Sequence, residues 1–211
     1  VQFEGVKAEH LWTRKHAGLF DVSHMGPCFL TLKRDDFRGD EAHAAISAEI
    51  EKLVPSAIAS LKPGQARLTV LLNEDGGILD DLIITRPDID ELLGTLYIVV
   101  IGAVKHNDSA VFEAALGNST RLVRVDARAL IALQGPEAVD VLQGFFPGCE
   151  DLKFMQSRRM YWNDVRCGVS RLGYTGEDGF EVLIFAEASE AFARALLDDR
   201  RVAPIGLGAR D

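Results

Sequence analysis

The sequence LTVLLNEDGGILDDLIIT, residues 68–85, carries the clearest structural signal in the chain. Two runs of β-forming residues, 68–72 and 78–85, are separated by the segment NEDGG, whose composition is typical of a hairpin turn. We therefore predict two antiparallel strands joined by this turn. The apolar run over residues 97–101 predicts a third strand of the same group.

Strands and helices alternate irregularly on both sides of the hairpin. Before it, a strand is predicted over residues 28–32 and one or two helices over 36–51. After it, the pattern predicts a helix over 107–116, with Asn107 as N-cap, and a strand over 121–125. The order strand, helix, strand, strand, helix, strand is that of a split β-α-β unit.

The remaining segments, before and after this region, also contain both helices and strands. The pattern there predicts a helix over residues 5–17, an extended piece over 20–25, a strand over 130–134, a helix opened by Pro136, an irregular polar stretch over 147–159, strands over 165–172 and 180–185, and a helix over 188–197. The predicted class is α+β.

Composition excludes several kinds of partner. The 211 residues carry a formal net charge of -9 and no run of Lys or Arg, which argues against nucleic acid or an anionic membrane as the main partner. No apolar stretch approaches the ~20 residues that cross a bilayer. Three widely spaced cysteines without a C-x-x-C motif favour a reducing compartment and no metal site. We expect an intracellular protein.

Two adjacent carboxylates interrupt the second strand of the hairpin. If residues 78–84 are extended, Asp80 and Asp81 lie on opposite faces, and each stands among apolar side chains. A carboxylate so placed is costly unless it is paired, and such groups are often kept for binding or proton transfer. The other interpretation is that one Asp faces solvent on an edge strand or caps a turn. The pattern alone leaves both open and does not say which Asp is functional.

A glycine-rich segment, GYTGEDGFE over residues 173–181, is the second candidate site. Its three glycines allow a tight turn and a close approach of backbone to a ligand. Glu181 can accept two N–H bonds from a flat polar heterocycle, and Tyr174 can supply a wall. A hairpin with an exposed Glu is the alternative.

These two segments, taken with three others, resemble the aminomethyltransferase family, the T protein of the glycine cleavage system. The other segments are AGLFDVSHMG at 17–26, LQGP at 133–136 and GLGARD at 206–211. The resemblance implies transfer of an aminomethyl group from the lipoyl arm of the H protein to tetrahydrofolate, giving methylenetetrahydrofolate, ammonia and the dihydrolipoyl carrier. It implies location in the cytoplasm, or in the mitochondrial matrix of a eukaryote.

The resemblance also implies roles for individual residues. Asp80 falls on the family's carboxylate beside the reactive nitrogens of folate, which makes it the expected catalytic residue. Tyr174 and Glu181 fall on pterin contacts, and Met25 falls on a residue that lines the folate pocket. Asp81, Glu177 and His24 are then expected to be structural.

By resemblance, two interleaved α+β domains with antiparallel sheets are expected. Residues 1–27 and 126–211 would form the first, folate-binding domain, and residues 28–125 the inserted second domain. The family continues beyond the GLGARD segment into a C-terminal β-barrel domain, which we expect to be absent from this chain. Folate would lie between the first two domains.

The chain departs from the family pattern at Ile101, Gly102 and Ala103, where members usually carry Asn-Ala. A polar side chain expected to face folate is missing there. The alternative function is therefore a catalytically inactive or truncated folate-binding relative. A folate domain of a sarcosine- or dimethylglycine-oxidising enzyme is a third interpretation, although those chains are much longer. Thr175 disfavours the related iron–sulfur-assembly proteins, which carry a cysteine in this block.

Overall fold

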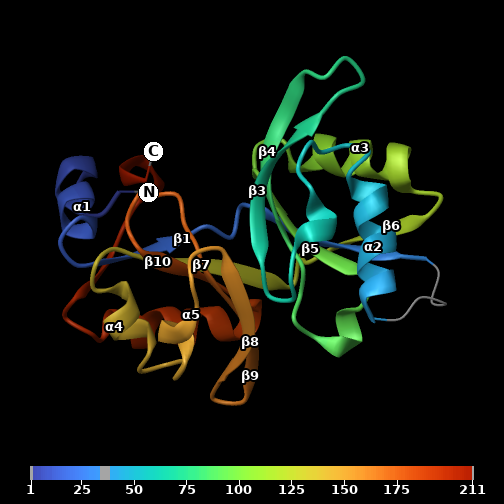
Figure 1. Cartoon of the computed structure of the whole chain (residues 1–211). Coiled ribbons are helices and arrows are strands. Elements are labelled where there is room, and N and C mark those ends of the chain that lie inside the picture. The colour runs from blue at the N-terminus through green and yellow to red at the C-terminus, as the bar shows by residue number, and fades with distance from the viewer. Residues whose placement is uncertain (1, 34–38, 211) are drawn as a thin grey trace. The chain divides into compact units, whose positions relative to one another are not determined.

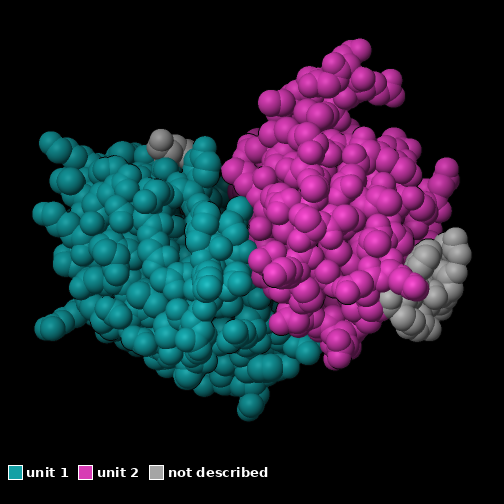
Figure 2. All heavy atoms as spheres, viewed as in Figure 1, with its two compact units in different colours: residues 1–24, 127–211 teal, residues 25–126 magenta. Residues whose placement is uncertain are grey.

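The chain forms two compact units, seen in a computed structural model that describes residues 2–33 and 39–210 (Figure 1). Unit 1 consists of Val1–His24 and Ala127–Asp211, and unit 2 consists of Met25–Asp126 (Figure 2). The chain therefore begins unit 1, builds unit 2 as an insertion and returns to unit 1. No helix in the described part of the chain is long and apolar enough to cross a membrane.

Unit 1 is built on a six-stranded sheet in the order β11-β1-β7-β10-β9-β8. Neighbouring strands are antiparallel except β1 and β11, which are parallel. The central strands β7 and β10 are buried along almost their whole length, which agrees with their continuous apolar sequences. The strands are β1 (Ala17–Asp21), β7 (Arg128–Gln134), β8 (Gln156–Trp162), β9 (Val165–Arg171), β10 (Gly179–Phe185) and β11 (Val202–Pro204).

The core of unit 1 includes an aromatic cluster around one helix residue. Phe192 lies on helix α5 (Ala186–Leu197) and is fully buried. Its ring centroid is 6.0 Å from that of Phe145, 5.7 Å from that of Phe146 and 5.2 Å from that of Trp162. Such tilted and edge-on ring pairs add to the apolar area that they bury. Two further helices, α1 (Val6–Thr13) and α4 (Ala138–Leu142), complete this unit.

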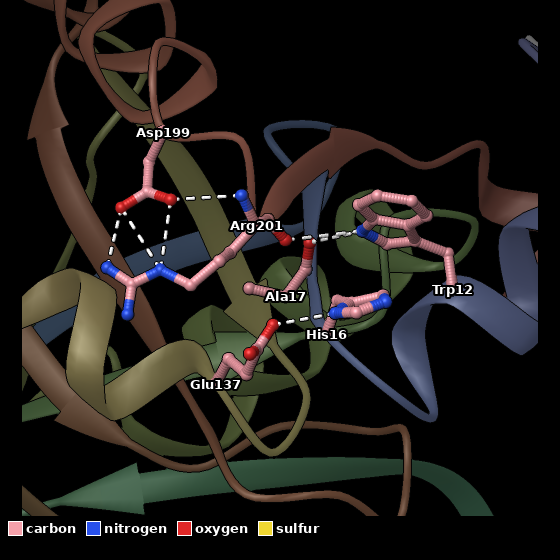
Figure 3. Close-up of polar contacts among 6 residues, drawn as sticks. All are labelled: Trp12, His16, Ala17, Glu137, Asp199 and Arg201. Atoms are coloured by element: carbon pink, nitrogen blue, oxygen red, sulfur yellow. Dashed lines mark hydrogen bonds and ion pairs between the residues drawn. The ribbon is translucent and has the colours of Figure 1, made fainter.

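Polar contacts join the first strand of unit 1 to the last one (Figure 3). The indole N–H of Trp12 donates to the carbonyl of Ala17 at 3.1 Å and to that of Arg201 at 3.3 Å. Arg201 in turn forms an ion pair with Asp199 at 2.6 Å. Because Trp12 lies in α1, these bonds join that helix to the start of β1 and to the turn before β11, which are far apart in sequence.

Unit 2 contains a five-stranded antiparallel sheet in the order β3-β4-β5-β2-β6. The predicted hairpin pairs β3 with β4. Without β3, which lies at the edge, the order β4-β5-β2-β6 is that of a split β-α-β fold, as predicted. The strands are β2 (Gly26–Leu32), β3 (Ala66–Leu72), β4 (Ile78–Thr85), β5 (Thr95–Val100) and β6 (Thr120–Arg124).

Two helices pack against the same face of this sheet. They are α2 (Gly39–Ile50) and α3 (Lys105–Leu116). Ile46 of α2 and Phe112 of α3 share one hydrophobic core with Leu82 of β4. The α+β class and the antiparallel sheets are therefore confirmed, and the side of β4 that faces the helices is the buried one.

Three local predictions are wrong. The stretch 147–159 was expected to be irregular, but Gln156–Trp162 forms β8 at the edge of the unit 1 sheet, where one side of the strand tolerates polar residues. Asn107 is not an N-cap, because the N–H of Asp108 already donates to Val104 at 3.1 Å and α3 begins at Lys105. Helix α1 ends at Thr13 rather than at Ala17, which opens β1. One or two helices were predicted over residues 36–51, and residues 36–38 of that range lie outside the described part of the chain.

Candidate functional site

Asp80 is a buried carboxylate on the core side of β4. Its exposed fraction is 7%, and it shares its strand face with the buried residues Leu82 and Ile84. The backbone N–H of Ile101, just after β5, donates to Asp80 Oδ2 at 3.1 Å. A charged group among apolar side chains needs such partners, because isolated burial of a carboxylate is costly. The local structure thus holds one oxygen of Asp80 in a fixed position.

The neighbouring carboxylate of β4 has a different environment. Asp81 points to the opposite face of the strand and is exposed. Alternation along the strand produces this difference, and the helices on one face of the sheet decide which Asp is buried. The sequence pattern did not say which Asp is functional. The structure shows that Asp80 is the buried carboxylate and that Asp81 is exposed.

A second buried carboxyl group lies next to Asp80 and was not found by sequence analysis. Asp108, in the first turn of α3, is completely buried. Its burial, followed by the hydrogen bond and the negative charge of Asp80, raises the pKa of Asp108 to about 7. One sequence signal could have indicated it: Asp108 has helical spacing with Phe112 and Leu116, so it stands on the apolar side of α3.

Met25 lies at the same end of the unit 2 sheet as Asp80. It immediately precedes Gly26, which pairs with Val100, and Val100 pairs with Leu82 on β4. Met25 also lines a small hollow of unit 2 whose wall includes apolar, thiol, hydroxyl and charged groups. The hollow is lined by Met25, Gly26, Pro27, Cys28, Val100, Lys105, Ser109, Arg124 and Asp126.

The glycine-rich segment of unit 1 is organised around the side chain of Gln134. Gln134 Nε2 donates to the carbonyl of Leu172 at 3.0 Å, and Thr175 donates to Gln134 Oε1 at 2.9 Å. A Cβ atom on Gly173 would overlap the Gln134 amide, and one on Gly179 would lie 2.6 Å from its nitrogen. These two glycines make room for Gln134, a reason that differs from the predicted approach to a ligand.

Glu181 and Tyr174 are connected through Arg210. Glu181 is 8% exposed on β10, and its Oε1 lies 3.7 Å from Arg210 Nη2. The guanidinium of Arg210 lies 5.6 Å from the ring centroid of Tyr174, which is 69% exposed. Arg210 belongs to the GLGARD segment, and the sequence analysis predicted no role for it. The structure therefore brings together two predicted site residues by means of a third residue that the prediction did not use.

Burial dominates the electrostatics of Glu181. It raises the pKa of Glu181 to about 7, and the positive charge of Arg210 opposes this rise. At 3.7 Å the pair is an ion pair rather than a short hydrogen bond. Glu181 therefore keeps acceptor capacity for N–H groups of a ligand. Glu177 of the same segment forms an ion pair with Arg14 at 2.7 Å.

The predicted site residues fall into two pairs, one in each unit. Tyr174 and Glu181 belong to unit 1, and Met25 and Asp80 belong to unit 2. Each pair has one buried carboxylate, and each carboxylate has a neighbour that the prediction missed: Arg210 for Glu181 and Asp108 for Asp80.

Comparison with known proteins places this geometry in a family. The model of the GCVT N-terminal domain matches residues 1–211. A protein of Schizosaccharomyces pombe named "Probable aminomethyltransferase, mitochondrial" is 46% identical over 217 residues, covering 100% of this chain and 52% of the relative. An aminomethyltransferase of Synechococcus sp. is 39% identical, covering 100% of this chain and 55% of the relative. The chain thus spans about half the length of the curated relatives that it matches.

Solved structures agree with this assignment. The glycine cleavage system aminomethyltransferase T from Bartonella henselae is similar with a TM-score of 0.84 and 37% identity, over 100% of this chain and 54% of that one. A heterotetrameric sarcosine oxidase from Corynebacterium sp. U-96 has a TM-score of 0.55 and 15% identity over 92% of this chain and 89% of that one, which shows a shared fold alone. The chain belongs to the family of the GCVT N-terminal domain.

Proposed function

We propose that the chain is part of a folate-dependent aminomethyltransferase of the glycine cleavage system. It transfers the aminomethyl unit carried on the lipoyl arm of the H protein to tetrahydrofolate. The one-carbon unit ends between two nitrogens of folate, the amine leaves as ammonia, and the sulfur of the lipoyl arm is released as a thiol. The relatives named aminomethyltransferases support this assignment at the level of the family.

The observation that carries the proposal is the environment of Asp80. A carboxylate held by the Ile101 N–H on an apolar strand face has a fixed orientation. It can orient the reactive nitrogens of folate and stabilise the cationic species that forms as ammonia leaves. A fixed charge does this better than solvent, because no reorganisation is needed during the reaction.

Unit 1 contributes recognition rather than chemistry in this proposal. Glu181 accepts N–H bonds from the amino-pyrimidinone edge of the pterin, and the exposed ring of Tyr174 stacks against its flat surface. Arg210 favours the ionised form of Glu181, because its positive charge opposes the rise in pKa that burial causes. In unit 2, Met25 is the proposed folate contact, and it lines a small hollow of that unit.

One observation favours a second candidate, a folate-binding relative without turnover. Residues 101–103 carry no polar side chain, and the hydrogen bond from this segment to Asp80 comes from the backbone N–H of Ile101 at 3.1 Å. A relative that binds folate without transferring the aminomethyl unit would retain Glu181, Tyr174 and Arg210.

Ammonia release distinguishes the two candidates. Aminomethylated H protein is mixed with tetrahydrofolate and the longest natural polypeptide that includes these 211 residues, and ammonia is measured over time. Folate-dependent release supports the transferase, and folate binding by calorimetry without release supports the second candidate. Absence of both folate binding and ammonia release would contradict both functions.

A further inference from the structure

Two buried carboxyl groups meet in unit 2 without a donor between them. Asp80 on β4 is 7% exposed and Asp108 on α3 is 0% exposed. Neither side-chain oxygen of Asp108 has a hydrogen-bond donor among the residues that the structure describes. Asp80 has one, the N–H of Ile101. Two carboxylates cannot bond to each other, so contact between these groups requires a proton on one of them.

Physical chemistry indicates which group holds this proton. Two like charges in one buried place repel, and the more deeply buried group gains more by becoming neutral. Asp108 is the more buried, and burial and Asp80 together raise the pKa of Asp108 to about 7. The first turn of a helix favours negative charge, but this effect opposes burial only in part.

We propose that Asp108 is a positioning residue for Asp80: it stays protonated and donates its O–H to the Asp80 carboxylate, which is held from the other side by the Ile101 N–H. This role rests on the proposed function only where it concerns turnover. The pair itself is a property of unit 2. With one proton it carries a single negative charge, and that charge resides on Asp80, where folate chemistry needs it.

Among residues 2–33 and 39–210, charged or titratable neighbours of Asp108 include Asp80, Cys28 and Lys105. Cys28 on β2 faces Asp108, and burial raises the pKa of this thiol to about 12, so the thiol stays neutral. The positive charge of Arg124 on β6 opposes this rise in the pKa of Cys28. Lys105 lies one helical turn before Asp108. Asp80 is thus the titratable group with the largest effect on Asp108.

Infrared spectroscopy tests the protonated carboxyl group directly and needs no folate. Glu181 also has a raised pKa, so spectra are recorded in a Glu181→Gln background. We expect the carbonyl stretch of a protonated carboxyl group at pH 6, its loss above pH 8, and its absence in Glu181→Gln/Asp108→Asn. Absence of this band at pH 6 in the Glu181→Gln protein would overturn the proposal.

Kinetics tests the positioning role with three variants. Asp108→Asn keeps an N–H donor toward Asp80. The rate of ammonia release should therefore fall by less than about tenfold, the change expected when one hydrogen bond is lost completely. Asp108→Ala removes the donor and should lower kcat by about 100-fold through loss of orientation. Asp81→Asn, the exposed neighbour on the other strand face, is the matched control and should leave kcat unchanged.

The pH profile separates positioning from a merely structural role. In the wild type, kcat should fall as pH rises through about 7, because Asp108 then ionises beside Asp80. Asp108→Asn cannot ionise and should lose this fall. Equal kcat in wild type and Asp108→Ala, or the same fall in Asp108→Asn, would contradict the role. If the infrared band is present but no folate-dependent ammonia release occurs, the proposed function is contradicted. The protonation of Asp108 beside Asp80 is then still supported.

Discussion

The two units neutralise a buried carboxyl group in different ways. In unit 1, Glu181 pairs with the cation Arg210 at 3.7 Å, so the charge is balanced by an opposite charge. In unit 2, Asp80 pairs with another acid, Asp108, so balance requires a proton. The pKa values of Glu181 and Asp108 are both raised to about 7, but Glu181 lies beside a cation and Asp108 lies beside another acid. Substitution of each partner should therefore have different consequences.

Removal of Arg210 should produce the largest loss of stability. Arg210→Gln leaves Glu181 buried without its cation, and breaking such a pair costs about 3 kcal/mol of the free energy of unfolding at pH 8. At pH 5 the loss should be smaller, because Glu181 is then protonated. Urea denaturation at both pH values measures this effect. Arg210→Gln/Glu181→Gln should recover most of the loss, and an equal loss at both pH values would refute the ion-pair explanation.

The glycine-rich segment of unit 1 should be the next most sensitive place. Gly173→Ala puts a methyl group into the Gln134 amide and should destabilise the protein by about 2 kcal/mol, as overpacking does. Thermal unfolding measures the loss. Gly176→Ala is the matched comparison, since Gly176 has a φ of 73° but no Gln134 contact and acts through backbone strain alone. If Gln134→Ala does not relieve the cost of Gly173→Ala, the steric explanation is wrong.

Asp108 should control how stability depends on pH. Its pKa is raised from the ordinary 3.8 to about 7, so the folded state holds the proton more tightly than the unfolded chain. That stabilisation is fully present below about pH 4 and is lost as pH rises to about 7, by at most roughly 1.4 kcal/mol per pH unit. Asp108→Asn should remove this slope and be more stable than wild type at pH 8, opposite in sign to Arg210→Gln.

Denaturation at pH 5, 6, 7 and 8 measures the slope. Glu181→Gln is the control, because Glu181 titrates in the same window and its own contribution must be subtracted. A wild-type slope that is unchanged in Asp108→Asn would mean that Asp108 does not hold the proton in the folded state.

The exposed ion pair of unit 1 should matter least. Arg14 and Glu177 lie 2.7 Å apart, with side-chain exposures of 41% and 27%. Solvent screens such a pair, so Arg14→Gln should change the free energy of unfolding by less than about 1 kcal/mol. A loss in urea denaturation as large as that of Arg210→Gln would break the distinction between buried and exposed pairs.

The hairpin was predictable because its signals are local. Two β-forming runs around a turn fix β3 and β4 whatever the rest of the chain does. The choice between Asp80 and Asp81 was not predictable from the pattern, since it depends on which sheet face α2 and α3 cover. Such packing joins residues far apart in sequence. Strand β8 was missed because the edge of a sheet accepts polar residues that otherwise indicate a loop.

The candidate site was predictable in part for the same reason. Glu181 and Tyr174 stand within one short segment and could be noticed together. Their partner Arg210 lies in another segment, and only the fold brings it within 3.7 Å of Glu181. Asp108 did have a local signal, its helical spacing with Phe112, but one acid on an apolar helix face is weak without a known neighbour.

A comparison of Asp80→Asn with Asp81→Asn in tetrahydrofolate-dependent ammonia release tests the proposed role of Asp80. Asp80→Asn keeps the size of the side chain and removes the charge, so kcat should fall by about 100- to 1,000-fold, as when one preorganised electrostatic group is lost. Asp81→Asn should match the wild type, because Asp81 is exposed on the opposite strand face. Wild-type release by Asp80→Asn would contradict the account.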